Sequence, residues 1–309
     1  MNGEKRLIVV VGPTAIGKTA LAIDIAEHFG TEILSCDSRQ FYKELSIGVA
    51  RPSDEELARA KHHFIANLSV VDYYNVSMYE QQALQCLEKL YETHDVAVAV
   101  GGSGLYVDAL CNGIADLPDP DPELRDKLKK EYEQGGIEEL RFQLKFLDYD
   151  YYQEVDLANH ARILRALEVC YMTGRPFSEV RKQAQKVRPF QITKIGMRMD
   201  RDTLNHRINQ RVDIMMGCGL LQEAKAMYQN RNLTALNTVG YKELFAYMDD
   251  EMSLELAVEK IKTNTRRYAK RQMTWLRRYD DINWIDVDSR TSSLDLAMEI
   301  IDKKNETQF

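Results

Sequence analysis

Hydrophobic and polar positions follow two different rhythms along the first part of the chain. A continuous apolar run at residues 7–11, "LIVVV", is typical of a strand that is buried on both faces of a sheet. After a glycine turn, "TALAIDIAEHFG" has the spacing of an amphipathic helix that ends at Gly30. Further strands are predicted at 32–37 and 96–104, with a helix between them at 77–95. This order predicts an α/β fold with a parallel, doubly wound sheet.

The rhythm changes at residues 116–128, where three prolines and five acidic residues interrupt it. From there to Pro189 the pattern is helical and rich in charged residues, and strands return only at 191–200 and 282–288. We therefore expect an α/β core with C-terminal helices and a helical insertion domain. The expected bounds are 1–118 with 190–309 for the core and 119–189 for the insertion.

Composition narrows the class of protein. The 309 residues are 44% hydrophobic, which is enough to bury a sizeable core. A net charge of -7 excludes a surface that is basic throughout, although it allows local basic patches. The five cysteines form no C-x-x-C pair, so neither a disulfide framework nor a zinc knuckle is predicted. No apolar run approaches the roughly 20 residues of a membrane helix. We expect a cytoplasmic monomer with no membrane partner.

The glycine turn is a phosphate-binding loop. Residues 12–19, "GPTAIGKT", satisfy G-x-x-x-x-G-K-[ST] between a strand and a helix, as in the P-loop NTPases. Backbone N–H groups and the lysine would bind phosphates, and the Thr19 hydroxyl would bind Mg²⁺. The residues assigned to diphosphate or nucleotide binding are Gly12, Pro13, Thr14, Ala15, Ile16, Gly17, Lys18 and Thr19. Such a loop predicts a polyphosphate ligand, ATP included, and leaves the reaction open.

Two polar residues follow the next strands at the same expected edge of the sheet. Asp37 ends the second strand, where a carboxylate can accept a proton from a nucleophile that faces the phosphate loop. Its alternative roles are to cap the next helix or to hold the metal through water. Ser103, in "GGSGLY", offers a hydroxyl after the third strand. The pair His62 and His63 has no third ligand at metal spacing, so packing or hydrogen bonding is the predicted role.

Two segments are strongly basic. Residues 180–199 contain six Lys or Arg and no acid, and residues 260–278 contain eight and no acid. Such runs are usually solvated helix faces. Because Tyr268 and Trp275 interrupt the second run, that segment also suits contacts with the phosphates and bases of a single-stranded RNA loop.

Taken together, eight stretches resemble the bacterial-type tRNA dimethylallyltransferases. In order they are "GPTAIGKT", "ILSCDSRQFYKELSIGVARP", "HHF", "VGGSGLYVDAL", "RILRALEVCYMTGRP", "RINQRVDIMMGCGLLQEA", "TVGYKEL" and "TRRYAKRQMTWLRR". The resemblance implies a core that binds dimethylallyl diphosphate with Mg²⁺, and an insertion that grips the tRNA anticodon stem-loop. It also implies that a flipped adenosine beside the anticodon receives the dimethylallyl group on N6, which forms N6-isopentenyladenosine and releases diphosphate.

Site residues follow from the same resemblance. Asp37 is the expected base, Thr19 the expected metal ligand, and Arg207 or Arg211 our choice for stabilising the leaving diphosphate. The expected tRNA-binding residues are Asp37, Ser38, Arg39, Gln40, Ser103, Arg125, Ala161, Arg162, Ile163, Leu164, Arg165, Gly240, Tyr241 and Lys242. Ser103 stands where the family usually has threonine, and Ala161 stands where many members have glutamine.

Three other functions remain open from the residues. A small-molecule kinase would explain the phosphate loop and Asp37 but not the two basic segments. An enzyme of the sister family, which prenylates free AMP or ATP, would need neither the insertion nor the second basic segment. A non-catalytic RNA-binding protein could use the loop for an ATP-dependent switch.

Overall fold

The computed structural model describes residues 4–182, 186–287 and 291–306, and it divides into two compact units. The α/β unit comprises Met1–Cys111 and Arg188–Phe309, and the helical unit comprises Asn112–Val187. The helical unit begins earlier than the expected residue 119 because the two ends of this segment bind each other. The N–H of Lys186 donates to the carbonyl of Asn112 at 3.0 Å.

The α/β unit is built on one sheet. Within the described residues it has six strands, all parallel, in the order β3-β2-β4-β1-β5-β6. The strands are β1 (Arg6–Val11), β2 (Ile33–Ser35), β3 (His62–His63), β4 (Val96–Gly101), β5 (Gln191–Arg198) and β6 (Ile282–Asp286). The predicted parallel, doubly wound sheet is confirmed.

Strand β3 was missed because two residues carry no hydrophobic pattern. It is formed by the histidine pair. His63 Nε2 lies 2.5 Å from Glu32 Oε2, and His62 Nδ1 lies 2.8 Å from the carbonyl of Ala60. The two histidines therefore have the hydrogen-bonding role that their spacing predicts.

Strand β1 is buried on both faces because it lies in the centre of the sheet. Ile8 and Val10 pack in one apolar cluster with α1 (Lys18–Phe29) and α13 (Ser293–Glu306). Leu7 and Val9 pack in the opposite cluster with α3 (Val76–Leu90) and α4 (Gly104–Asn112). A continuous apolar run is what such a strand requires.

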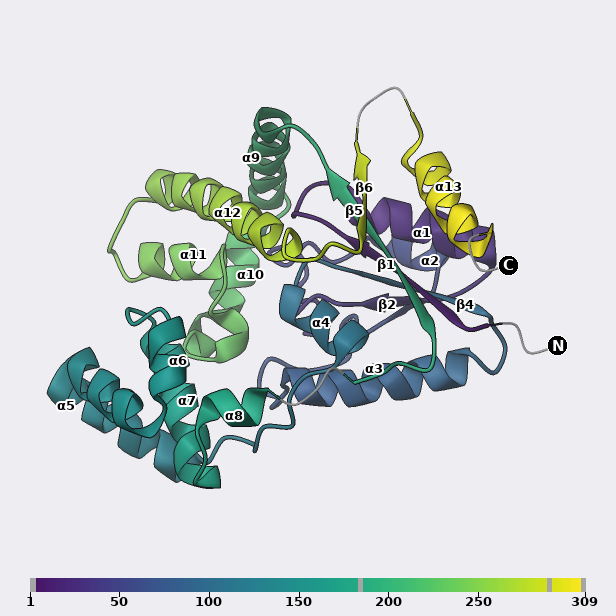
Figure 1. Ribbon diagram of the computed structural model, residues 1–309. Coiled ribbons are helices and arrows are strands. Elements are labelled where there is room, and N and C mark those ends of the chain that lie inside the picture. Colours follow the sequence, from purple (N-terminus) through teal and green to yellow (C-terminus); the bar gives the residue numbers. More distant parts are fainter. Residues whose placement is uncertain (1–3, 183–185, 288–290, 307–309) are drawn as a thin grey trace. The chain divides into compact units, whose positions relative to one another are not determined.

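A set of helices lies beyond the carboxyl ends of the strands (Figure 1). It contains α9 (Arg201–Gly217), α10 (Leu220–Met227), α11 (Tyr241–Met248) and α12 (Leu254–Leu276), with the short helices η1 (Tyr228–Asn230) and η2 (Thr234–Leu236) between α10 and α11. The short helix α2 (Asp54–Arg59) follows β2 in the chain. Helices α9, α10, α11 and α12 share an apolar cluster with Tyr42 and Leu45, from the loop after β2. No helix in the described part of the chain is long and apolar enough to cross a membrane.

The helical unit has its own core. Its helices are α5 (Pro122–Leu147), α6 (Tyr149–Glu154), α7 (His160–Thr173) and α8 (Phe177–Arg181). Leu140 and Leu144 of α5 pack with Ile163 and Leu167 of α7. Helix α5 is interrupted at Gly136, whose φ of 71° lies in the left-handed region that glycine tolerates.

A buried ion pair fixes the point where the chain returns to the α/β unit. Arg188 Nη2 lies 2.8 Å from Glu80 Oε1 on α3, and the two side chains are only 6% and 4% exposed. Arg188 also donates to the carbonyls of Ala109 and Leu110 at the end of α4. The arginine therefore ties the start of the returning segment to two helices on one face of the sheet.

Replacing Glu80 should leave the buried charge of Arg188 uncompensated. We expect Glu80→Gln to lower the free energy of unfolding by about 3 kcal/mol, measured by urea denaturation. The matched control is Asp95→Asn, which removes the acid of the exposed Lys5–Asp95 pair. An equally small effect of both substitutions would contradict a structural role for the buried pair.

Candidate active site

The phosphate loop turns sharply between β1 and α1. Gly12 and Gly17 have φ values of 155° and 107°, and Ala15 also has a positive φ of 66°. A Cβ on Gly12 would lie 2.9 Å from the carbonyl oxygen of Met197 on β5, so glycine is required there for close approach as well. The loop therefore has the backbone geometry that its sequence predicts.

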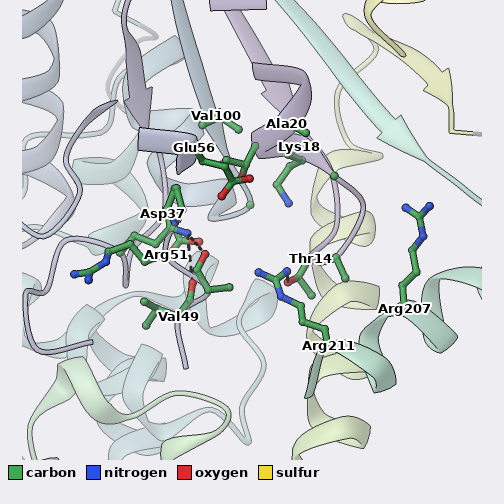
Figure 2. Close-up of a pocket in the computed structure, with 18 of the residues that line it drawn as sticks. Thr14, Lys18, Ala20, Asp37, Val49, Arg51, Glu56, Val100, Arg207 and Arg211 are labelled. Atoms are coloured by element: carbon green, nitrogen blue, oxygen red, sulfur yellow. Dashed lines mark hydrogen bonds between the residues drawn. The ribbon is translucent and has the colours of Figure 1, made fainter. Parts of the chain in front are cut away.

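A pocket of about 450 Å³ opens above this loop. It brings together the predicted catalytic residues Thr19, Asp37, Arg207 and Arg211, which come from α1, the loop after β2, and α9. Figure 2 shows Arg211 beside Thr14, with Asp37 and Arg51 across the pocket and Lys18 pointing inward. The loop residues on its wall are Thr14, Ala15, Gly17, Lys18 and Thr19. Ile16 is instead part of the apolar core and is 1% exposed.

Positive charge is concentrated in this pocket. Burial and, to a lesser extent, the charge of Arg211 together lower the pKa of Lys18 to about 8, while Asp37 opposes both effects. Burial also lowers the pKa of Arg211, which an arginine tolerates without losing its charge. Lys18 Nζ donates to the carbonyl of Pro13 at 2.8 Å. A bound phosphate would place negative charge beside Lys18 and Arg211.

Asp37 is held in a local turn. Its Oδ1 accepts the N–H of Arg39 at 2.9 Å, which closes a turn of the kind that aspartate favours. It caps no helix, since the next helix, α2, begins at Asp54. The hydroxyl of Ser103 accepts the N–H of Ser38 at 3.0 Å and donates to its hydroxyl at 3.2 Å. The loops after β2 and β4 are therefore joined through Ser103.

Gln272 is a site residue that the sequence interpretation missed. Its Oε1 accepts the N–H of Thr14, and its Nε2 donates to the carbonyl of Gly102, both at 2.9 Å. The side chain, on α12, is buried at 6% exposure. Gln272 thus connects the phosphate loop to the glycine loop after β4. It lies inside the stretch "TRRYAKRQMTWLRR", whose predicted role rests on its basic and aromatic side chains.

A second missed group fixes the loop that carries Val49, Ala50 and Arg51 into the pocket. The carboxylate of Glu223, on α10, accepts the backbone N–H groups of Ser46, Ile47 and Gly48, each at 2.9 Å. It also accepts the hydroxyl of Tyr241 at 2.5 Å.

The other end of this loop is held by Gln40. Its side-chain amide donates to the carbonyls of Ala50 at 3.0 Å and Val49 at 3.4 Å. Tyr241 packs against the loop as well, because a Cβ on Gly48 would lie 2.7 Å from its ring. The loop is therefore fixed from both sides.

An apolar cavity of about 120 Å³ adjoins the pocket. Thr14, Asp37 and Arg211 line both spaces. The apolar residues of the cavity wall are Val49, Ala50, Ile208, Val212, Met215, Leu220, Val239 and Ile261. Arg39, Gly240 and Tyr268 also line it. A ligand that spans both spaces would have a charged end at the phosphate loop and an apolar end in this cavity.

The expected tRNA contacts have different surroundings. Ala161, Arg162 and Lys242 are exposed and Leu164 is half-buried. Tyr241 and Ile163 are 0% exposed, so their side chains serve the packing of their own units and offer no surface to RNA.

Two arginines of the helical unit share one acid. Arg125 and Arg165 bind the same oxygen of Glu168, at 2.8 and 2.6 Å, and the side chain of Glu168 is 1% exposed. Arg165 also donates to the carbonyl of Pro118 at 2.7 Å. Both arginines therefore have a structural role within this unit.

The first basic segment is largely neutralised. Of its six cations, five form ion pairs with acids from other segments: Arg181–Glu154, Lys186–Asp116, Arg188–Glu80, Lys194–Asp281 and Arg198–Asp286. The absence of acids within 180–199 therefore reflects pairing across the fold. The second basic segment begins on α12 and ends two residues beyond it.

Magnesium has a compatible set of oxygens. Thr19, Asp37 and Glu56 all line the pocket. Within the ranges that the structure describes, no group of three or more His, Cys, Asp or Glu side chains could hold a metal by itself. Mg²⁺ that is bound with phosphates needs only one or two protein oxygens. The pocket therefore fits a cation that arrives with its polyphosphate ligand.

The lowered pKa of Lys18 predicts a pH dependence for phosphate binding. Below pH about 8 the lysine is protonated and attracts an anion, and above it the charge is lost. We expect the affinity for inorganic pyrophosphate, measured by calorimetry between pH 7 and 10, to fall more steeply in the unsubstituted protein than in Lys18→Arg. The arginine stays charged throughout this range. Identical pH profiles would contradict this assignment.

Removing Glu223 should loosen the loop that carries Val49, Ala50 and Arg51 into the pocket. In Glu223→Ala, three partly buried N–H groups and one hydroxyl lose their acceptor, so we expect hydrogen–deuterium exchange at Ser46, Ile47 and Gly48 to accelerate at least tenfold. The control is Glu255→Ala in the exposed first turn of α12. Unchanged exchange would show that Tyr241 and Gln40 hold the loop without the carboxylate.

The chain is similar to known proteins over most of its length. A family model described as IPP transferase matches residues 40–279. The chain is 50% identical over 285 residues to tRNA dimethylallyltransferase 1 of Phocaeicola vulgatus, covering 92% of this chain and 95% of that one. It is 33% identical to the full-length tRNA isopentenylpyrophosphate transferase structure from Bacillus halodurans, with a TM-score of 0.72 and 98% of each chain covered. A eukaryotic dimethylallyltransferase acting on tRNA shares the fold at a TM-score of 0.82 and 24% identity, covering 99% of this chain and 80% of that one. The chain belongs to the IPP transferase family.

Proposed function

We propose that this protein transfers a dimethylallyl group from dimethylallyl diphosphate to N6 of the adenosine beside the anticodon of tRNA. The products are diphosphate and N6-isopentenyladenosine. The observation that carries the proposal is the position of Asp37, which lines both the phosphate-loop pocket and the apolar cavity. Relatives named tRNA dimethylallyltransferase, which align over more than nine-tenths of the chain, support the same reaction.

The donor has two chemically different ends. Its diphosphate would bind the N–H groups of the phosphate loop together with Lys18, and its branched five-carbon chain would enter the apolar cavity. Mg²⁺, held by Thr19 and by phosphate oxygens, would neutralise part of the diphosphate charge. The allylic carbon would then lie near the boundary of the two spaces, where Asp37, Thr14 and Arg211 meet.

The acceptor requires a base, because an exocyclic adenine amine is a poor nucleophile. As N6 attacks the allylic carbon, the C–N bond forms, the C–O bond breaks, and the bonding electrons leave with the diphosphate. Asp37 takes the proton from N6, which is expected to contribute about 10²- to 10⁴-fold to the rate. Lys18, Arg211 and Arg207 stabilise the charge that accumulates on the leaving group.

The adenine must leave the stack of the anticodon loop to reach Asp37. Arg39 and Tyr268 line the apolar cavity and suit contacts with a flipped base and its phosphates. We propose that the exposed side chains of Arg162 and Lys242 contact the anticodon stem-loop. A monomer acting in the cytoplasm is sufficient for this reaction.

One assay separates this reaction from its alternatives. The protein is incubated with dimethylallyl diphosphate, Mg²⁺ and unmodified tRNA, and the digested RNA is examined by mass spectrometry for C5H8 on adenosine. Parallel reactions replace the tRNA by AMP or ATP. Prenylated free nucleotide without prenylated tRNA would assign the chain to the sister activity. No transfer in any reaction would overturn the proposal.

Asp37 and Glu56 are both acids of the pocket, so a matched pair of variants tests which one is the base. We expect Asp37→Asn to bind tRNA normally and to lose 10²- to 10⁴-fold in kcat, because asparagine can keep the bond to Arg39 but cannot accept the proton. Glu56→Gln should lose far less, since one oxygen of Glu56 accepts the N–H of Ser53 in the cap of α2. A greater loss in Glu56→Gln would transfer the role to that residue.

A further inference from the structure

A second large cavity lies outside the active site. It has a volume of about 420 Å³ and is formed by α9, α12, the end of β5 and Pro13. It shares no lining residue with the phosphate-loop pocket or with the apolar cavity. Figure 1 shows α9 and α12 close to each other at the end of the sheet where β5 ends. We call it the basic cavity, because six of its lining residues are cations: Arg198, Arg201, Arg266, Arg267, Lys270 and Arg277.

The charges of the basic cavity are largely uncompensated. Arg198 is paired with Asp286 through two contacts of 2.7 and 2.9 Å. Arg201, Lys270 and Arg277 have no ion pair within residues 4–182, 186–287 and 291–306, and no acidic residue lines the cavity. In a chain of net charge -7, such a local concentration of positive charge attracts a negatively charged partner.

Among the residues that the structure describes, the other two arginines have only neutral partners. Arg266 donates to Asn209 at 2.5 Å and to Thr263 at 2.9 Å, and Arg267 donates to Asn264 at 3.3 Å. Such bonds orient a guanidinium without cancelling its charge. The basic cavity therefore holds five cations whose charge no acid on its wall offsets.

One face of α12 supplies most of this lining. Thr263, Arg267, Lys270, Thr274 and Arg277 recur every three or four residues, which places them along one side of the helix. Gln272 and Tyr268 lie on other sides, where they serve the phosphate loop and the apolar cavity. The charges of the basic cavity are thus not part of the active-site wall.

We propose that the basic cavity is a second phosphate-binding site, which takes two or more phosphate groups of one chain. Guanidinium groups fit phosphate oxygens in pairs, and five cations exceed what a single phosphate can neutralise. Met199, Leu204 and Met273 add an apolar floor on which the sugar or base of a nucleotide can lie. The phosphates come either from an RNA backbone, which rests on the proposed function, or from a free polyphosphate.

The site is expected to communicate with the active site through Pro13. This residue lines the basic cavity, and its carbonyl accepts the ammonium group of Lys18. A ligand in the basic cavity would therefore contact a residue of the phosphate loop whose carbonyl binds Lys18.

The test uses the full chain and the double variant Arg201→Gln with Lys270→Gln. Both side chains are exposed and carry no ion pair in the described residues, so the fold should persist with an unchanged melting temperature. The control is Lys89→Gln with Lys225→Gln, which removes the same charge from exposed positions on α3 and α10.

In the first arm, inorganic tripolyphosphate is titrated by calorimetry at low salt. We expect two binding events per chain, of which one is lost or weakened at least tenfold in the double variant only. In the second arm, an unmodified anticodon stem-loop RNA is bound at several KCl concentrations. The slope of log affinity against log salt should become shallower by about 1.4, because each phosphate contact in single-stranded RNA contributes about 0.7.

The two arms show whether the phosphates come from an RNA backbone or from a free polyphosphate. A change in the RNA arm alone assigns the cavity to the RNA backbone, and a change in the tripolyphosphate arm alone assigns it to a free polyphosphate. If neither arm differs from the control, the proposal is overturned. If the unsubstituted protein binds no RNA, the proposed function fails, but the tripolyphosphate arm still decides whether the basic cavity binds phosphates.

Discussion

The buried amide of Gln272 is the contact on which the geometry of the active site depends. It accepts the N–H of Thr14 and donates to the carbonyl of Gly102, so the phosphate loop and the glycine loop after β4 are held as one piece. Water cannot replace these bonds at a side chain that is 6% exposed. A Cβ on Gly102 would lie 2.2 Å from the amide nitrogen of Gln272, so a larger residue there would displace this amide. The position of α12 therefore controls the shape of the phosphate-loop pocket.

The parts of the site that the sequence predicts are those defined by local pattern. The phosphate loop and Asp37 each follow a buried strand, and in a parallel sheet the carboxyl ends of strands share one edge. Gln272 and Glu223 were not predicted because the loops that they bind are distant in the sequence, 170 and 258 residues away for Gln272 and 175–177 residues away for Glu223. Strand β3 escaped because it has two residues. Nothing local distinguishes such residues from other polar side chains on amphipathic helices.

Charge counting failed for a related reason. Residues 180–199 contain no acid, yet five of their cations find acids elsewhere in the fold, including the buried pair of Arg188 and Glu80. A basic segment without acids shows only that the acids that pair with it are distant in the sequence or absent. Burial distinguishes the two cases, since an arginine at 6% exposure must be paired. Tyr241, one of the expected RNA contacts, is 0% exposed, and its hydroxyl donates to Glu223, which holds the loop at residues 46–48.

The second basic segment combines several roles because α12 is long enough to present different sides to different neighbours. Gln272 faces the phosphate loop, Tyr268 faces the apolar cavity, and Lys270 faces the basic cavity. Successive residues of a helix point about 100° apart, so adjacent positions can serve separate sites. A substitution at one position can then alter the phosphate-loop pocket while a substitution at its neighbour alters the basic cavity. Since both sites are supported by one rigid helix, a shift of α12 would change them together.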